Sequence, residues 1–160
     1  ALRRAPALAE GFAHVVAIDP PAGAGEEARL FGHASQRLLH LAWGSDELDF
    51  AVHIHEREHD LRAPLAAIYR ALRDLGDAEG EELEAALRGE PELSRSPLVA
   101  GRVLGILAEL GLVSLDREAR RVVVPAAERT SLDRSPTYRG CERRFKDGLR
   151  YLTGATARAA

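Results

Sequence analysis

Short apolar runs separated by polar connections fill the first third of the chain. Residues 15–18 are mostly β-branched and end at an Asp-Pro-Pro sequence, which predicts a buried strand followed by a loop. Residues 26–33 have the pattern of a short helix, and residues 37–43 predict a second strand. Strand, helix and strand in this order predict a small parallel βαβ unit with a right-handed crossover.

Two helices are predicted next. Ser45 is placed to cap the first, with Asp46 and Glu47 in the first turn, where the helix dipole favours negative charge. The second begins near Pro64, which suits a first helical turn, and ends at Gly76. Its apolar positions recur at helical spacing, which predicts a buried stripe: Leu65, Ile68, Tyr69, Leu72 and Leu75.

A weaker and a stronger helical pattern follow. The weaker helix covers residues 79–88. The stronger one opens at Ser96 and Pro97, an N-cap and a first-turn proline, and ends at Gly111. Its predicted buried face consists of Val99, Val103, Ile106, Leu107 and Leu110.

A hairpin and a last helix complete the pattern. Strands are predicted near residues 113–116 and 121–125, on either side of a charged turn, and Ser135-Pro136 opens the last helix. The buried stripe of that helix is Cys141, Phe145, Leu149 and Leu152. Residues 60–125 therefore run helix, helix, helix, hairpin, which is the element order of a winged helix.

The predicted fold class is α/β (α+β): a small parallel βαβ layer, then a helical, winged-helix-like half with a β-hairpin and a C-terminal helix. We expect the first part to cover residues 1–59 and the second residues 60–153. The two either share one core over residues 10–153 or form two lobes. Residues 154–160 are expected to be a disordered tail.

Composition limits the class of protein. The chain has 160 residues, of which 46% are hydrophobic and 29% charged, as in ordinary globular domains. No apolar run approaches the roughly 20 residues that span a bilayer, so we expect a cytoplasmic protein without a membrane partner. Cys141 is the single cysteine, which excludes an intramolecular disulfide. The absence of methionine suggests that the chain is a piece of a longer protein. We expect the chain to be monomeric.

Basic residues concentrate near the C-terminus. Between Arg117 and Arg150 there are ten Lys or Arg against five Asp or Glu, whereas the whole chain has a net charge of −3. A basic block on an acidic chain indicates an anionic partner. The helix that would read DNA, residues 98–110, offers only Arg102 as a donor on its outward face and adds Glu109. A sequence-specific DNA reader is therefore not expected.

One stretch matches a zinc-protease motif. His55-Glu56-Arg57-Glu58-His59 fits H-E-x-x-H, in which two histidines one helical turn apart hold the metal. In a working site the two middle positions are usually apolar, but here they are Arg57 and Glu58. We therefore predict a solvated helix end and no metal.

A second stretch matches a dinucleotide-binding motif. Gly23 and Gly25 are followed by Ala28 between a strand and a helix. However, Glu26 and Glu27 place negative charge where a phosphate would bind the helix start. We predict a plain connection, and hence neither a cofactor nor a catalytic site in this chain.

Five sequence segments follow one another along the chain: VVAIDPP, RLLHLAWGSDELDFAV, LRAPLAAIYRALRDL, VAGRVLGILAELGLV and SLDRSPTYRGCERRFKDGLRYL. In this order they resemble the C-terminal domain of the RecJ single-strand-specific 5′–3′ DNA exonucleases, over about residues 10–152. The resemblance implies that the nuclease core with its two divalent metal ions, and an OB-fold domain, lie upstream in the parent protein. No D-H-H motif is present here, so no catalytic or metal role carries over.

The resemblance also implies a function: a non-catalytic domain that docks the acidic C-terminal tail of single-stranded DNA-binding protein (SSB) in DNA repair and recombination, and that contacts its own upstream domains. Such a tail needs an apolar slot rimmed by arginine, which Leu132, Tyr138 and Phe145 are placed to form. The residues expected to contact the partner are Arg120, Arg121, Arg134, Tyr138, Arg139, Arg143, Arg144, Phe145 and Lys146. Two alternatives remain open: a winged-helix-like single-stranded DNA-binding module, and a stand-alone zinc hydrolase using His55 and His59.

Overall fold

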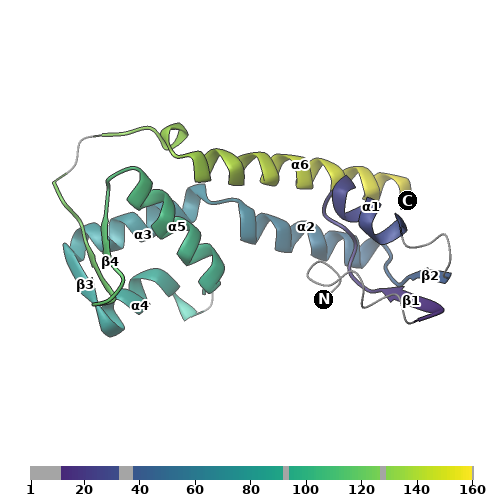
Figure 1. The fold of residues 1–160 in the computed structure, drawn as a ribbon, viewed down its shortest axis with the longest axis horizontal. Helices are drawn as coiled ribbons and strands as arrows, with labels where there is room; N and C mark the ends of the chain where they lie inside the picture. Colours follow the sequence, from purple (N-terminus) through teal and green to yellow (C-terminus); the bar gives the residue numbers. More distant parts are fainter. Residues whose placement is uncertain (1–11, 33–37, 92–93, 127–128, 160) are drawn as a thin grey trace. The chain divides into compact units, whose positions relative to one another are not determined.

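The chain forms two compact units. The computed structural model describes residues 12–32, 38–91, 94–126 and 129–159, with side chains as far as residue 154. Unit 1 consists of Ala1–Arg57 together with Phe145–Ala160, and unit 2 of Glu58–Arg144 (Figure 1). The first boundary lies close to the one predicted after residue 59. The second falls inside the last helix and was not predicted, because the sequence does not show which core each half of a long helix faces.

Unit 1 contains the predicted parallel βαβ arrangement. Strand β1 (His14–Ala17) and strand β2 (Leu38–Leu41) pair in parallel, and helix α1 (Ala24–Gly32) connects them. The predicted ends of the short helix and the second strand, residues 33 and 37, lie outside the described residues. The prediction that the first strand is buried was wrong, since Val16 and Ile18 are 57% and 68% exposed.

Helix α2 (Ser45–His59) has a different cap from the one predicted. The carbonyl of Gly44 accepts the first helical hydrogen bond, from the Leu48 amide at 3.2 Å. The Gly44 amide in turn donates to the Glu47 carboxylate at 2.7 Å, which lowers the pKa of Glu47. Gly44 is therefore the N-cap, and Ser45 is the first helical residue. Glu47 supplies the carboxylate half of a capping box.

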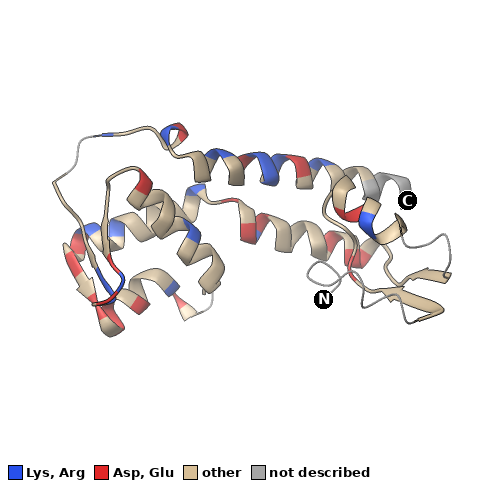
Figure 2. Ribbon diagram, viewed as in Figure 1, with Lys and Arg blue, Asp and Glu red and all other residues tan. Residues whose placement is uncertain are grey.

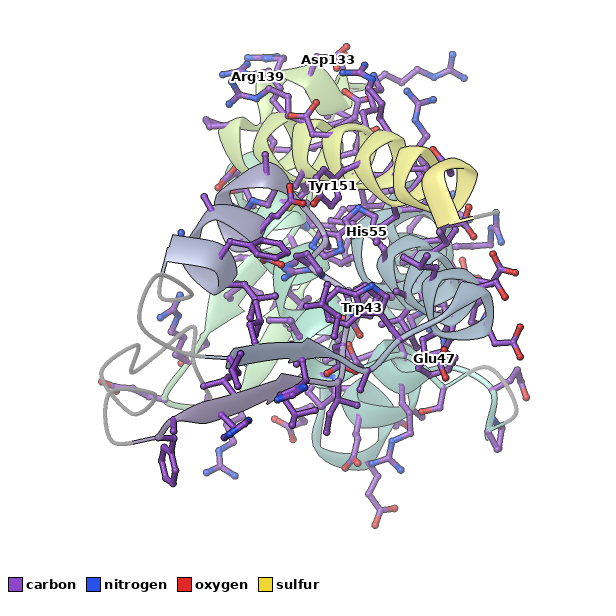
Figure 3. All side chains as sticks on the ribbon, turned by 90° about the vertical axis from the view of Figure 1, so that its right-hand side faces the viewer. Trp43, Glu47, His55, Asp133, Arg139 and Tyr151 are labelled. Atoms are coloured by element: carbon purple, nitrogen blue, oxygen red, sulfur yellow. The ribbon has the colours of Figure 1, made fainter. Side chains whose placement is uncertain are left out.

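In unit 1, α2 packs against the second half of helix α6 (Pro136–Ala159) through a buried histidine. The Nε2 atom of His55 lies 3.1 Å from the carbonyl oxygen of Phe145, and the two rings are nearly parallel, with centroids 6.2 Å apart. Gly148 lies against the same imidazole, and Leu152 is fully buried. Figure 3 shows His55 on the side of α2 that faces α6.

Unit 2 has the winged-helix arrangement. Its elements are α3 (Arg62–Leu75), β3 (Asp77–Glu79), α4 (Gly80–Arg88), α5 (Pro97–Glu109), β4 (Ser114–Asp116) and β5 (Arg121–Val123). The three strands form an antiparallel sheet in the order β3-β5-β4, so the strand after the first helix pairs with the last strand. The predicted hairpin is confirmed. The additional strand β3 was not predicted, because its sequence DAE has no strand-like pattern.

The core of unit 2 is made by the predicted helical stripes. On α3, Leu65, Ile68 and Leu72 are buried, as predicted, whereas Leu75 is 41% exposed. The predicted face of α5 is also confirmed: Val99, Val103, Ile106 and Leu107 are buried, and Leu110 is partly buried. Ser96 caps α5 as predicted, since its hydroxyl accepts the Val99 amide at 3.2 Å.

The short 3₁₀ helix η4 (Leu132–Arg134) leads into α6, which begins at the predicted Pro136. Helix α6 continues to Ala159, so the prediction of a disordered tail from residue 154 was wrong for residues 154–159. Residue 160 lies outside the described residues. The helix continues through Gly154, the glycine at which an end was expected, and contains no proline after Pro136.

The fold class is the predicted one. The structure is mixed α/β, with a small parallel sheet, a small antiparallel sheet and a C-terminal helix. Among the helices within the described ranges, none is both long enough and apolar enough to cross a membrane.

Candidate docking surface

Two serine caps position the segment that carries the basic residues. The hydroxyl of Ser131 accepts the Asp133 amide at 3.4 Å at the start of η4. The hydroxyl of Ser135 accepts the Tyr138 amide at 3.0 Å and caps α6, as predicted. Each cap satisfies an amide that the helix start leaves unpaired. The two caps therefore fix where the side chains of η4 and of the first turns of α6 point.

Within unit 2, helix α6 has one buried side and one basic side. Tyr138 and Cys141 are buried against the unit 2 core. Arg139 and Arg143, four residues apart, are exposed and lie together on another side of the helix. Arg134 is exposed on η4, just before the helix. We call these three side chains, Arg134, Arg139 and Arg143, the arginine surface. Figure 2 shows the basic residues spread along α6.

The guanidinium groups of this surface are only partly engaged by other residues. Together with hydrogen bonds from Ser135 and Thr137, the charge of Arg139 contributes to lowering the pKa of Glu109. Arg139 donates to the backbone carbonyl of Asp133 at 2.6 Å, which holds it beside η4, and Figure 3 shows the two residues together. Within the described ranges, the side chains of Arg134, Arg143 and Arg144 form no hydrogen bond or ion pair. Arg144 is also exposed, but it lies roughly 100° around the helix from Arg143. The arginine surface is therefore available to an anion.

Tyr138 does not contribute to a surface slot. Its side chain is only 3% exposed and belongs to the unit 2 core. Its hydroxyl accepts a hydrogen bond from Nε of Arg62 at 3.0 Å, which raises the pKa of Arg62. Arg62 also lies 3.9 Å from Glu142. The prediction that Tyr138 lines a docking slot was thus wrong, and its role is to hold Arg62.

Two further residues that were predicted to contact the partner, Phe145 and Lys146, also lie on α6 but belong to unit 1. Phe145 is half-buried and faces the His55 ring, and Lys146 is exposed on the next position of α6. Leu132, predicted beside them, is partly buried against the unit 2 core. Within unit 2, Tyr138 is buried and Leu132 is partly buried, so these two side chains do not form an exposed apolar slot.

The hairpin holds the remaining predicted cations, and one of them is already paired. On β5, Arg121 forms a two-pronged ion pair with Asp77 on β3, with Nε at 2.7 Å from Oδ1. This contact lowers the pKa of Asp77 and raises that of Arg121. Arg120 is exposed in the turn, in a left-handed conformation with φ of 52°. Arg121 is therefore committed to the sheet, whereas Arg120 is not.

The helix that would enter the DNA groove lacks base-reading groups, as predicted. Arg102 is half-buried and donates to the Glu58 carbonyl at 2.7 Å. The exposed positions of α5 include Leu98, Gly101 and Glu109, none of which donates to a base edge. The carboxylate of Glu109 is itself occupied by Ser135 and Thr137 at the start of α6.

The two motif matches also have structural roles. In the H-E-x-x-H stretch, Nε2 of His55 forms a hydrogen bond with the Phe145 carbonyl. In the glycine motif, the Glu26 carboxylate accepts the Ala22 amide at 3.0 Å, so a carboxylate already lies where a phosphate would bind. In the described part of the chain, no group of three or more His, Cys, Asp or Glu side chains is arranged to hold a metal ion.

Two residues that bind predicted contact residues, Tyr138 and Arg121, were not identified from the sequence. Arg62 and Asp77 lie far along the chain from the basic block, and each meets its partner only after folding. No local pattern distinguishes them from solvated charges. Only a correct pairing of β3 with β5 would have brought Asp77 to Arg121.

No family model, no curated protein and no solved structure matches the chain.

Proposed function

We propose that the chain is a non-catalytic docking domain of a RecJ-like single-strand DNA exonuclease, and that its arginine surface binds the acidic C-terminal tail of SSB. The observation that carries this proposal is the row of exposed Arg134, Arg139 and Arg143 beside the start of α6. Each guanidinium presents a planar fork of donors that matches a carboxylate. Asp side chains and a terminal carboxylate provide such acceptors along a flexible tail.

An acidic peptide suits this surface better than a nucleic acid does. Proteins that bind single strands usually stack the bases on exposed aromatic side chains. Unit 2 has only two aromatic residues, Tyr69 and Tyr138, of which the first is half-buried and the second is buried.

The expected affinity is modest. An exposed arginine surface without a deep slot supports a dissociation constant on the order of micromolar, or about −8 kcal/mol. Because the charges are exposed, salt screens them. We expect the affinity to fall severalfold as NaCl is raised from about 50 mM to about 500 mM.

The test is a titration of the full chain with an SSB-tail peptide that has several Asp residues and ends in an apolar residue with a free carboxylate. The double variant Arg139→Glu/Arg143→Glu should reduce the affinity at least tenfold. Arg88→Glu is the control, because Arg88 is also exposed but lies on α4, where it pairs with Glu84. The control should bind as the unchanged chain does.

Two results would contradict the proposal. The first is no binding of the peptide at low salt. The second is binding of an oligothymidine that the Arg139/Arg143 double variant abolishes while peptide binding is absent; this result would favour the single-stranded DNA-binding alternative. A peptide with an amidated C-terminus separates the contribution of the terminal carboxylate from that of the Asp side chains.

A further inference from the structure

Two histidines face each other on the small parallel sheet of unit 1. Nδ1 of His14, on β1, lies 2.9 Å from Nε2 of His40, on β2. In the strand register, His14 is opposite Leu38 and Val16 is opposite His40, so the two imidazoles are diagonal neighbours on one face. Both side chains are exposed.

The two rings meet head-on. The angle between their planes is 14°, and their centroids are 5.2 Å apart. The nitrogen–nitrogen distance is 2.9 Å, so the centroid distance is longer by about two ring radii. The two nitrogens therefore point at each other and hold one proton between them. In the neutral pair, one nitrogen donates and the other accepts.

We propose that His14 and His40 bind a divalent transition-metal ion of the zinc, nickel or copper class through these two nitrogens. The proton between them then moves to the other nitrogen of the ring that carries it, so that both ligands are neutral imidazoles. Neutral imidazole is a preferred ligand of these ions. Two nitrogens that lie about 2.1 Å from one ion are about 3 Å apart at a right angle and about 3.4 Å apart in the tetrahedral geometry of zinc. The observed separation of 2.9 Å is close to these spacings. Binding therefore requires the two rings to turn and separate slightly.

The surroundings allow such an ion to enter. Neither strand carries a charged residue, since β1 reads HVVA and β2 reads LLHL. The neighbours on the same face, Val16 and Leu38, are more than half exposed and leave the pair open to solvent. Water supplies the remaining coordination positions, which makes this an open site with two protein ligands.

Metal binding would stabilise the sheet. Within the described residues the parallel sheet has only two strands, and isolated two-stranded sheets are marginally stable. An ion held by His14 and His40 connects β1 to β2 across the α1 connection. Because the unfolded chain does not hold the two imidazoles together, binding shifts the equilibrium towards the folded unit.

The experiment is a calorimetric titration of the full chain with ZnCl₂, with MgCl₂ as the control ion because imidazole does not suit magnesium. We expect one zinc ion per chain and a rise in melting temperature on zinc addition. His14→Ala and His40→Gln should each weaken zinc binding at least tenfold and abolish that rise. His40→Gln keeps a hydrogen-bond partner for His14, so it is the deciding variant where His14→Ala fails to fold.

Two control variants test two of the four other histidines. His53→Ala removes an exposed histidine from α2, and His59→Ala disrupts the H-E-x-x-H pair. Both should bind zinc as the unchanged chain does. Absence of zinc binding, equal affinity in His40→Gln, or loss of binding in His59→Ala would each overturn the proposal.

Discussion

The carboxylate of Glu109, the last residue of α5, accepts a hydrogen bond from the hydroxyl of Ser135, the N-cap of α6. The same carboxylate accepts the Thr137 amide at 3.2 Å and the Thr137 hydroxyl. A negative group thus lies at the start of α6, where the helix dipole favours it. This contact connects the would-be DNA-reading helix to the segment that carries the arginine surface.

Ser135→Ala should destabilise unit 2 by about 1–2 kcal/mol. The side chain is fully buried, and its hydroxyl both caps the Tyr138 amide and donates to Glu109. Removing it leaves both groups without this partner. Urea unfolding measures the change. Ser131→Ala is the control, because Ser131 caps only the short η4 helix and is exposed. Equal losses in the two variants would contradict the special role of Ser135.

Glu109→Gln should remove part of the acid sensitivity of unit 2. Hydrogen bonds from Ser135 and Thr137 lower the pKa of Glu109 below its ordinary value of 4.5. A carboxyl group whose pKa is lower in the folded state stabilises that state above its ordinary pKa. The contribution is lost as the pH falls below 4.5 and through the folded pKa.

Unfolding free energies measured between about pH 7 and pH 3 test this. The unchanged chain should lose stability over the acidic part of that range more steeply than Glu109→Gln does. Because Glu109 is exposed, the difference should be modest and should shrink in high salt. Parallel profiles for the two chains would show that the Glu109 contact does not depend on its charge.

Gly148→Ala should destabilise unit 1 by about 1–3 kcal/mol, the usual cost of overpacking. A Cβ atom at this position would clash with Cε1 of His55, a buried ring held by the Phe145 carbonyl. Chemical denaturation followed by circular dichroism measures the effect.

A matched control lies on the same helix. At Gly140 an added Cβ has no neighbour within 4 Å, so Gly140→Ala should gain up to about 1 kcal/mol from helix propensity. The double variant Gly148→Ala/His55→Ala removes the clash and should recover part of the loss. If Gly148→Ala alone were as stable as Gly140→Ala, the close packing of α2 on α6 in unit 1 would be wrong.

Local patterns in the sequence were sufficient for most helices. Ser96-Pro97 and Ser135-Pro136 each predicted a helix start that the structure confirms, because a capping hydroxyl and a first-turn proline act within a few residues of each other. The stripe on α3 was equally local. The same reasoning failed at Ser45, where the neighbouring Gly44 serves as the cap because Glu47 reaches back to its amide.

The candidate site depended on contacts that no local pattern shows. Tyr138 looks like an exposed aromatic beside basic residues, but the fold places it in the core, where Arg62 reaches its hydroxyl. Strand β3 has a polar, three-residue sequence, and it forms because β5 offers a free edge. Consequently the pairing of Arg121 with Asp77 was not predictable, and the sequence alone overcounted the free cations of the hairpin.

Asp77→Asn offers a way to locate the docking surface. The substitution removes the charge that holds Arg121 and therefore frees a cation on the hairpin. If the tail binds the arginine surface on η4 and α6, its affinity should stay within about twofold, since each exposed charge acts mainly over a Debye length of about 10 Å or less. Calorimetric titration with the SSB-tail peptide measures it. A severalfold gain in affinity would instead place the acidic tail on the β4–β5 hairpin, where Arg120 and the released Arg121 would both contact it.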